Sequence, residues 1–318
     1  MYARTATAVL TAAAVMGTGA LLMSSTDTRT TSRTTAAAGH TATVTDVRTV
    51  SARTGGPGRG GPVVFAHRGA SAYAPENTLA AVDKADDLGI DWVENDVQLS
   101  KDGVLVVMHD TDLRRTTNVE EVFPDRTSWA VKDFTAAEIA RLDAGSWFGP
   151  EFAGARVPTL GQYLNRVERN RQKLLLEIKS PEIYPGIEKA TLRELRRQGW
   201  LDRDHVKNRL VIQSFGAESV KKVHQQRPDV TTGFLGTPAV ADLPSYAAFT
   251  DQINPSHSSV TADYVTAVHA LKGAHKKRLR VNTWTVNDAA TAKRLAGLGV
   301  DGIITNNPDV VREATGRG

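Results

Sequence analysis

The sequence predicts a (β/α)8 TIM barrel over residues 63–318. Short apolar runs alternate with helical patterns, and eight such runs remain when the return strand of one hairpin is set aside. Eight strand–helix units in roughly 250 residues are typical of this fold. An open, doubly wound sheet is the alternative, and no glycine-rich dinucleotide fingerprint supports it.

The first expected strand is Val63–His67, an apolar run that suits a buried parallel strand. A helical pattern over Glu76–Leu88 follows and ends at Gly89, and Trp92–Leu99 is the next strand. Segments with helical spacing of apolar residues lie between the later strands. Those strands are expected at Leu174–Lys179, Leu210–Phe215, Thr232–Leu235, Gln252–Pro255, Arg280–Val286 and Gly302–Thr305.

The segment of about residues 111–158 is too long for an ordinary connection. We expect it to hold a small helical insertion after the second strand and its hairpin. Thr135 and Glu138 have the spacing of a capping box, which predicts the start of one short helix. Trp147, Phe148 and Phe152 are expected to form the core of the insertion, and an apolar lip for a lipid tail is the alternative.

The N-terminus has the features of a secretory signal peptide over residues 1–23, an uncharged apolar run behind Arg4. Small residues leave the cleavage site open up to residue 38, and a single uncleaved membrane anchor is the alternative. Residues 24–62 are rich in Ser, Thr and Gly and predict a disordered tether. We therefore expect a secreted or extracytoplasmic protein without stable membrane insertion after signal removal.

Composition excludes several kinds of site and partner. The chain has 318 residues and no cysteine, so disulfides, thiolate metal sites and cysteine nucleophiles are excluded. Its formal net charge of +4 lies wholly in the first 62 residues, which hold six Arg and two Asp. The predicted barrel is therefore formally neutral, which argues against nucleic acid as a partner.

Glu94 and Asp96 lie two residues apart on an expected strand, so their side chains share one face. If that face is the barrel interior, burial and mutual repulsion raise a pKa or demand a cation; otherwise the two side chains face solvent or pair with basic residues. The Asp102-Gly103 turn favours the interior, because it places His109 opposite Asp96. A loop of Lys101-Asp102 places His109 opposite Glu94 instead, on the same face.

Glu177, on the neighbouring expected strand, completes a possible set of three carboxylates. Carboxylates without thiolates suit a hard divalent cation better than Zn²⁺, and we expect Ca²⁺ in preference to Mg²⁺. His67 and His109 suit a general acid and a general base, while Arg68 and Lys179 supply fixed positive charge. Together these groups indicate attack at a phosphate ester.

These motifs resemble the glycerophosphodiester phosphodiesterase family from about Val63 to Asp309. The resemblance implies a (β/α)8 fold with a small insertion, a glycerophosphodiester as the small-molecule substrate, and hydrolysis to an alcohol and glycerol 3-phosphate. The matching stretches are His67–Ala70, Pro75–Thr78, Glu94–Leu99, Lys101–Gly103, Val107–Asp110, Glu177–Lys179, Trp284–Asn287 and Asp301–Asn306.

The resemblance also implies roles for single residues. It makes Glu94, Asp96 and Glu177 the metal ligands. It makes His67 and His109 the catalytic pair, and our preferred hypothesis has His109 as the base and His67 as the acid. The attacking group is water or the glycerol 2-hydroxyl of the substrate. The implied substrate-binding residues are Arg68, Lys179, Glu76, Asn77 and Trp284.

Two features depart from or lie beside that pattern. Asn95 stands where the family usually has an apolar residue, and it should face the outer helices. Asp110 faces away from His109 in an extended chain, so it is not expected to be a ligand. Two other functions stay open, a phospholipase D-like enzyme acting on lysolipid or sphingomyelin and a catalytically inactive wall-binding module. The latter predicts loss of a histidine or carboxylate, and none is lost.

Overall fold

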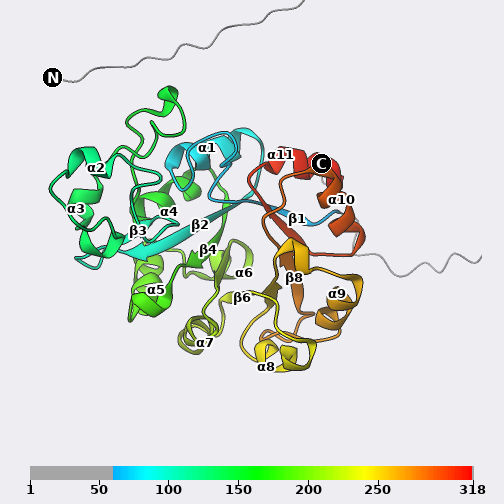
Figure 1. Ribbon diagram of the computed structural model, residues 1–318. Coiled ribbons are helices and arrows are strands. Elements are labelled where there is room, and N and C mark those ends of the chain that lie inside the picture. The colour runs from blue at the N-terminus through cyan, green and yellow to red at the C-terminus, as the bar shows by residue number, and fades with distance from the viewer. Residues whose placement is uncertain (1–59, 317–318) are drawn as a thin grey trace, which may run out of the picture. The chain divides into compact units, whose positions relative to one another are not determined.

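The structure, a computed structural model, describes residues 60–316, which contain a closed barrel of eight parallel strands (Figure 1). β1 pairs with β9 on one side and with β2 on the other, so the ring closes and the predicted (β/α)8 fold is confirmed. The predicted signal peptide and most of the predicted tether lie outside the described residues. The barrel strands are β1 (Val63–Ala66), β2 (Trp92–Leu99), β4 (Lys173–Ile178), β5 (Leu210–Ser214), β6 (Thr231–Leu235), β7 (Gln252–Asn254), β8 (Arg280–Thr283) and β9 (Gly302–Thr305).

Helices between the strands form the outer layer of the barrel (Figure 1). The first begins at Leu79 rather than at the predicted Glu76, because Asn77 has a φ of 59° and Thr78 caps the helix through its side-chain oxygen. The helices are α1 (Leu79–Asp87), α4 (Leu160–Arg169), α5 (Ile187–Arg197), α6 (Arg203–Asn208), α7 (Ala217–Gln226), α8 (Leu243–Ala247), α9 (Ala262–His269), α10 (Ala289–Gly297) and α11 (Pro308–Thr315).

Apolar side chains fill both faces of the sheet. Along β4, Leu175 packs inside the barrel, where it meets Phe65 and Val211. Its neighbours Leu174 and Leu176 belong to the larger cluster between the strands and the helices. Close packing on both faces fixes the strand register, and so it fixes where the polar side chains on the same strands lie.

The segment after the second strand forms a small unit with its own core. It holds α2 (Val119–Val122) and α3 (Ala136–Ile139), which lie beyond β3 in Figure 1. Thr135 and Glu138 form the predicted capping box, with both reciprocal hydrogen bonds present. Buried apolar side chains, Leu113 and Phe134 among them, pack together inside this unit.

The prediction for the aromatic residues of the insertion is wrong. Trp147, Phe148 and Phe152 stack edge-to-face on one another outside that core, and Trp147 is 41% exposed. The reason lies in Asp143, whose carboxylate accepts hydrogen bonds from three backbone N–H groups, two of them close by and one from Gly154. The loop therefore closes on itself, and the rings remain at its surface.

The hairpin has a register that the sequence did not predict. β3 (Leu105–Val107) pairs with β2 so that Val97 lies opposite Val107, midway between the two expected registers. The turn has three residues between Ser100 and Val104, which share a backbone hydrogen bond of 2.9 Å. Neither predicted partner of His109 therefore lies opposite it, and β3 ends before that residue.

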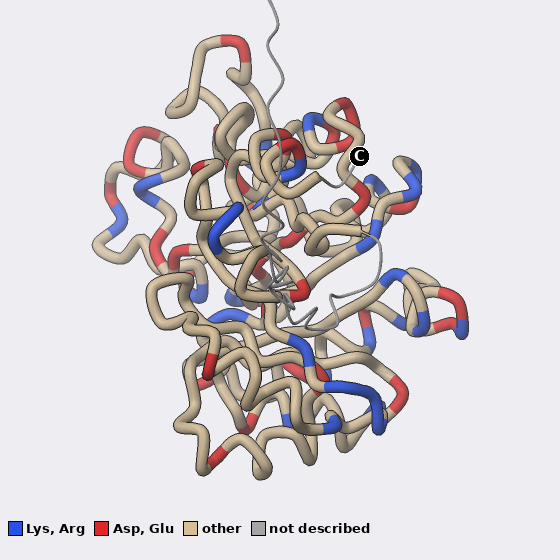
Figure 2. The backbone as a smooth tube through the Cα atoms, turned by 90° about the vertical axis from the view of Figure 1, so that its right-hand side faces the viewer, with Lys and Arg blue, Asp and Glu red and all other residues tan. Residues whose placement is uncertain are grey.

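Charged residues of both signs are interspersed along the described chain (Figure 2). Several of the ion pairs join side chains that are exposed or partly exposed. Within residues 60–316, no helix has both the length and the apolar character needed to span a membrane.

Candidate active site

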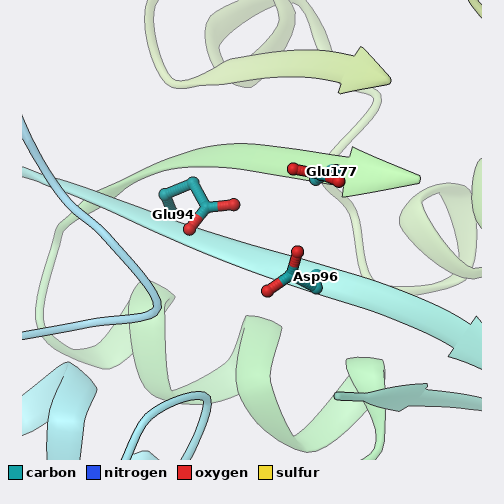
Figure 3. A group of neighbouring side chains, drawn as sticks. All are labelled: Glu94, Asp96 and Glu177. Atoms are coloured by element: carbon teal, nitrogen blue, oxygen red, sulfur yellow. The ribbon is translucent and has the colours of Figure 1, made fainter. Parts of the chain in front are cut away.

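The adjacent strands β2 and β4 bring three acidic side chains together (Figure 3). Glu94 and Asp96 come from β2, and Glu177 on β4 is the register partner of Asp96. One oxygen from each carboxylate lies within 4.8 Å of the others, and all three side chains are buried. The structure thus gathers the three residues that the sequence predicted as metal ligands.

Burial and mutual repulsion oppose full ionisation of this cluster. Burial raises the pKa of Glu94 well above its usual range, and the charges of Asp96 and Glu177 add to the effect. Burial and Asp96 raise the pKa of Glu177 to about 8. Burial also opposes ionisation of Asp96, but the positive charges around it, that of Arg68 first, and the hydrogen bond from Asn77 together lower the pKa of Asp96. Without a cation, some of these carboxyl groups hold a proton at neutral pH.

The donors around the cluster leave one oxygen unmatched. The backbone N–H of Arg68 donates to Glu94 Oε2 at 2.8 Å, and Asn77 Nδ2 donates to Asp96 Oδ2 at 2.9 Å. Glu94 Oε1 is buried and has no hydrogen-bond partner among the described residues. A buried carboxylate oxygen without a donor, beside two further carboxylates, fits a bound hard divalent cation.

A sharp turn after β1 delivers the Arg68 backbone to Glu94. Arg68 has a φ of 55°, a conformation that is rare and strained for residues other than glycine. Gly69 follows with a φ of 79°, and a Cβ there would lie 2.6 Å from the backbone carbon of Ala81. Only glycine fits this close approach of the turn to α1.

Two cationic side chains flank the carboxylates. Arg68 Nε lies 3.5 Å from Asp96 Oδ2, and its Nη1 donates to Glu76 Oε1 at 2.9 Å. Lys179 Nζ donates to Glu177 Oε1 at 3.1 Å and lies 5.3 Å from the centre of the Phe215 ring. Positive charge is thus fixed on two sides of the site, as anion binding requires.

The two histidines have different partners. His67 Nδ1 lies 2.6 Å from Asn306 Oδ1, a neutral acceptor, and burial together with Arg68 lowers the pKa of His67 to about 4. His109 Nδ1 lies 2.7 Å from Asp110 Oδ1, an anionic acceptor. Because each partner atom accepts, each Nδ1 carries a proton, and each Nε2 is left to act on a substrate.

His109 reaches the site on the turn that follows β3. The buried side chain of Gln98 holds this turn, because its Nε2 lies 2.7 Å from the carbonyl oxygen of Met108, 3.1 Å from that of His109 and 2.7 Å from that of Asp110. Tyr184 in turn donates to Gln98 Oε1 at 2.9 Å. The buried amide of Gln98 therefore places His109 at the site, and the expected strand pairing does not.

A cavity of about 100 Å³ lies among these groups. Glu76 and Asn77, predicted to bind substrate, do not line it; Glu76 holds Arg68 and Asn77 holds Asp96. Trp284, the predicted aromatic wall, lines the cavity and packs edge-to-face on Phe215 at 5.4 Å between ring centres. The lining residues are His67, Arg68, Glu94, His109, Glu177, Lys179, Gln213, Phe215, Leu235, Trp284, Thr285 and Ile304.

A larger cavity, of about 650 Å³, lies elsewhere on the barrel. Its lining includes the first residues of several strands, such as Val63 and Leu210, so it lies at the opposite end from the carboxylates. None of the predicted site residues lines it. Since active sites of these barrels lie at the carboxyl ends of the strands, the smaller cavity is the candidate site.

Sequence reasoning gave no role to four residues that hold this site, which are Gln98, Asp110, Arg115 and Asn306. Arg115 bonds both Asp110 and Glu76, and Asp110 bonds His109 rather than facing away from it. Asn306 lies within a stretch that matches the family but is ordinary as a single residue. The contact of Asn306 with His67 spans 239 residues, beyond any local pattern, whereas Asp110 lies next to His109 and five residues from Arg115, so the local sequence holds part of this signal.

Three comparisons with known proteins agree with this geometry. The model of the glycerophosphoryl diester phosphodiesterase family matches residues 67–310. A glycerophosphodiester phosphodiesterase of Bacillus subtilis is 35% identical over 265 residues, which cover 78% of this chain and 84% of that protein. A glycerophosphodiester phosphodiesterase of Caldanaerobacter subterraneus is 36% identical over 253 residues, which cover 78% of this chain and 96% of that protein.

A solved structure of a phosphodiesterase is also similar to this chain. The phosphodiesterase of Oleispira antarctica in complex with the product sn-glycerol-3-phosphate has a TM-score of 0.69 and 28% identity, over 80% of this chain and 96% of that one. Fold, site and relatives together define a barrel enzyme that hydrolyses phosphoric diesters. The family match spans more than half of the chain. The protein belongs to the glycerophosphodiester phosphodiesterase family.

Proposed function

We propose that this protein is a secreted, cation-dependent enzyme that hydrolyses glycerophosphodiesters to an alcohol and glycerol 3-phosphate, using His67 and His109 for proton transfer. One observation carries the proposal: in a buried trio of carboxylates, one has an oxygen without a donor among the described residues, and two of the three line a cavity with two histidines and two fixed cations. The product bound to the Oleispira antarctica relative supports glycerol 3-phosphate as one product.

Glu94, Asp96 and Glu177 would hold the cation, and their all-oxygen donor set favours Ca²⁺, with Mg²⁺ as the alternative. A cation bound there supplies Lewis-acid stabilisation of negative charge on the phosphoryl oxygens. Arg68 and Lys179 add N–H donors on either side of the same space.

The partners of the histidines favour roles opposite to those preferred from the sequence. The anionic carboxylate of Asp110 accepts from His109 Nδ1 and holds the ring at the cavity with Nε2 free to exchange a proton, which suits a general acid. His67 has a neutral partner and a lowered pKa, so its unprotonated Nε2 suits a general base. In this proposal His67 takes the proton of the attacking water or glycerol 2-hydroxyl, and His109 gives a proton to the leaving alkoxide as the P–O bond breaks. Attack by the 2-hydroxyl forms a cyclic glycerol phosphate first, which water then opens to glycerol 3-phosphate.

Trp284 and Phe215 form the apolar side of the cavity. The indole N–H of Trp284 donates to the carbonyl of Asn254 at 2.8 Å, which fixes the ring. We infer that the carbon face of the substrate glycerol lies against these rings, while its phosphate lies toward Arg68 and Lys179.

A choline-release assay tests the activity. We expect release from glycerophosphocholine with Ca²⁺ supplied, loss of release in chelator, and recovery when the cation returns. Preference for lysophosphatidylcholine would replace the proposal with the lipid-directed alternative. No release from either substrate, with Ca²⁺ or Mg²⁺ present, would favour the inactive wall-binding module.

Export is tested on its own. Expression of the full reading frame should place the protein outside the cytoplasm, with a mature N-terminus between residues 24 and 39. A cell-associated chain that keeps residues 1–23 would contradict cleavage and favour the anchored alternative.

A further inference from the structure

Arg115, in the insertion, bridges two carboxylates that come from different parts of the chain. Its Nε donates to Asp110 Oδ2 at 2.5 Å, and its Nη1 donates to Glu76 Oε2 at 2.9 Å. Its Nη2 serves both groups, at 3.1 Å from Asp110 Oδ1 and 2.7 Å from Glu76 Oε1. One planar guanidinium thus binds two carboxylates at once, each through two N–H···O contacts.

Each carboxylate passes the contact on to a residue of the active-site cavity. Asp110 Oδ1 lies 2.7 Å from His109 Nδ1, and Glu76 Oε1 accepts from Arg68 Nη1 at 2.9 Å. His109 and Arg68 both line the cavity, whereas Arg115 does not. The Arg115 guanidinium therefore connects His109, one of the two catalytic histidines, with Arg68, the side chain that binds phosphate.

The bridge also resolves a charge conflict. Asp110 and Glu76 converge on the same nitrogen, so without a cation between them they would repel each other. Burial opposes ionisation of both, but hydrogen bonds from Arg115 lower the pKa of Glu76 and bring that of Asp110 to about 2. Asp110 therefore stays an anion across the neutral range and always accepts from His109 Nδ1, which fixes the imidazole tautomer.

The adjacent residue, Arg114, forms an ion pair that has no connection to the cavity. Arg114 binds Asp112 through Nε at 2.9 Å and Nη2 at 3.0 Å, with both side chains exposed. That pair leads to no residue of the cavity. Exposed pairs of this kind contribute little to stability. Arg114 is thus a matched control, one residue away and of the same chemistry.

We propose that Arg115 is a positioning residue for phosphodiester hydrolysis, which holds His109 and Arg68 in their relative placement through Asp110 and Glu76. It touches neither the substrate nor the reacting atoms. This inference rests on the proposed function, because it assigns His109 the proton transfer and Arg68 the phosphate.

The test compares Arg115→Ala with Arg114→Ala on glycerophosphocholine with Ca²⁺. Arg115→Ala should lower kcat by about 10- to 100-fold, the usual effect of losing a group that orients a catalytic residue. Arg114→Ala should leave kcat within about twofold of the wild type, since surface substitutions of this kind perturb little. Arg115→Lys should recover only part of the loss, because a single ammonium cannot bind both carboxylates in the same way.

A coupling measurement separates positioning from structural damage. If Arg115 acts through Asp110, then adding Asp110→Asn to Arg115→Ala should cost much less than Asp110→Asn costs in the wild type. Structural damage at two separate places would instead give additive losses. Melting curves of all variants establish that each is folded, and if Arg115→Ala is not folded, Arg115→Lys decides.

Several outcomes would overturn the inference. They are a wild-type kcat for Arg115→Ala, an equal loss for Arg114→Ala, full activity of Arg115→Lys, or additive losses with Asp110→Asn. A wild-type enzyme that releases no choline with either cation present would instead overturn the proposed function, before any variant is compared.

Discussion

Asp96 and Glu177 are register partners on the adjacent parallel strands β2 and β4, and their carboxylates lie on the interior face that Glu94 shares (Figure 3). Three buried acids so close together are unfavourable unless a cation or protons offset their charge. The register of two strands thus sets both the affinity of the site for a cation and the response of the protein to pH.

Glu177→Gln should remove the cation site while keeping the shape of the side chain. Losing even a supporting residue weakens a metal site by about 10- to 100-fold, so losing this carboxylate should weaken Ca²⁺ binding by at least that factor. Calorimetric titration with CaCl₂ measures the affinity. Glu182→Gln, on the exposed neighbouring turn, is the control and should bind Ca²⁺ like the wild type. Equal affinity in both variants would contradict the assignment.

In chelator, the folded protein should become less stable as pH rises from about 6.5 to 9. Burial and Asp96 raise the pKa of Glu177 to about 8, whereas an unfolded glutamate titrates near ~4.3. The folded state therefore keeps a proton that the unfolded state has lost, and the resulting stability disappears as pH rises through the folded pKa. Urea midpoints across this range measure the effect.

The pH range and a control with Ca²⁺ make this test specific for the carboxylates. His67 has a folded pKa near 4 and an unfolded value of ~6.5, so its opposite contribution fades within about one pH unit above ~6.5, and beyond that only the loss from Glu177 remains. Excess Ca²⁺ should reverse the trend, because binding needs ionised carboxylates and is stronger at high pH. A midpoint in chelator that is flat or rises with pH would contradict the prediction.

The two histidines should respond differently to the leaving group. His109→Ala should slow release of choline by about 10²–10⁴-fold if His109 is the general acid. The same variant should lose far less on a glycerophospho-p-nitrophenyl ester, because p-nitrophenolate leaves without a proton. His67→Ala should lose similar activity on both substrates, since the attacking group still needs a base. The reverse pattern would restore His109 as the base and His67 as the acid.

The sequence predicts this site unevenly, for physical reasons. Glu94 and Asp96 share a face because a strand repeats every two residues, which is a local property. The match of Asp96 with Glu177 depends on how β2 and β4 align, and residues far apart in sequence set that alignment. The hairpin shows the limit: a three-residue turn shifts the expected register by one position, and His109 arrives through Gln98 instead.

The fold is easier to predict from the sequence than the residues that hold the active-site side chains in place. Buried strands such as Val63–Ala66 and helices such as Leu160–Arg169 follow from apolar runs and periodicity. Arg115 and Asn306 are single polar residues, and their contacts with Glu76 and His67 span 39 and 239 residues of the chain. Only the closed barrel brings those partners together, so no window of sequence contains the signal.

Asn95 offers a test of the outer face of β2. It is fully buried, lies beside Leu176 on β4, and neither its side-chain oxygen nor its nitrogen has a hydrogen-bond partner among the described residues. An unsatisfied buried amide costs about 1–3 kcal/mol. Asn95→Leu removes that cost and keeps the same number and branching of side-chain heavy atoms, so it should stabilise the barrel and raise the Tm.

The gain should leave turnover unchanged, because residues that alternate along a strand face opposite sides and Asn95 points away from Glu94 and Asp96. Melting curves in the same buffer, with and without Ca²⁺, measure the change. Asn165→Leu is the control, since Asn165 is exposed on α4 and hydrates freely, so its replacement should not raise the Tm. A lower Tm for Asn95→Leu, or the same gain from Asn165→Leu, would show that the amide of Asn95 carries no such penalty.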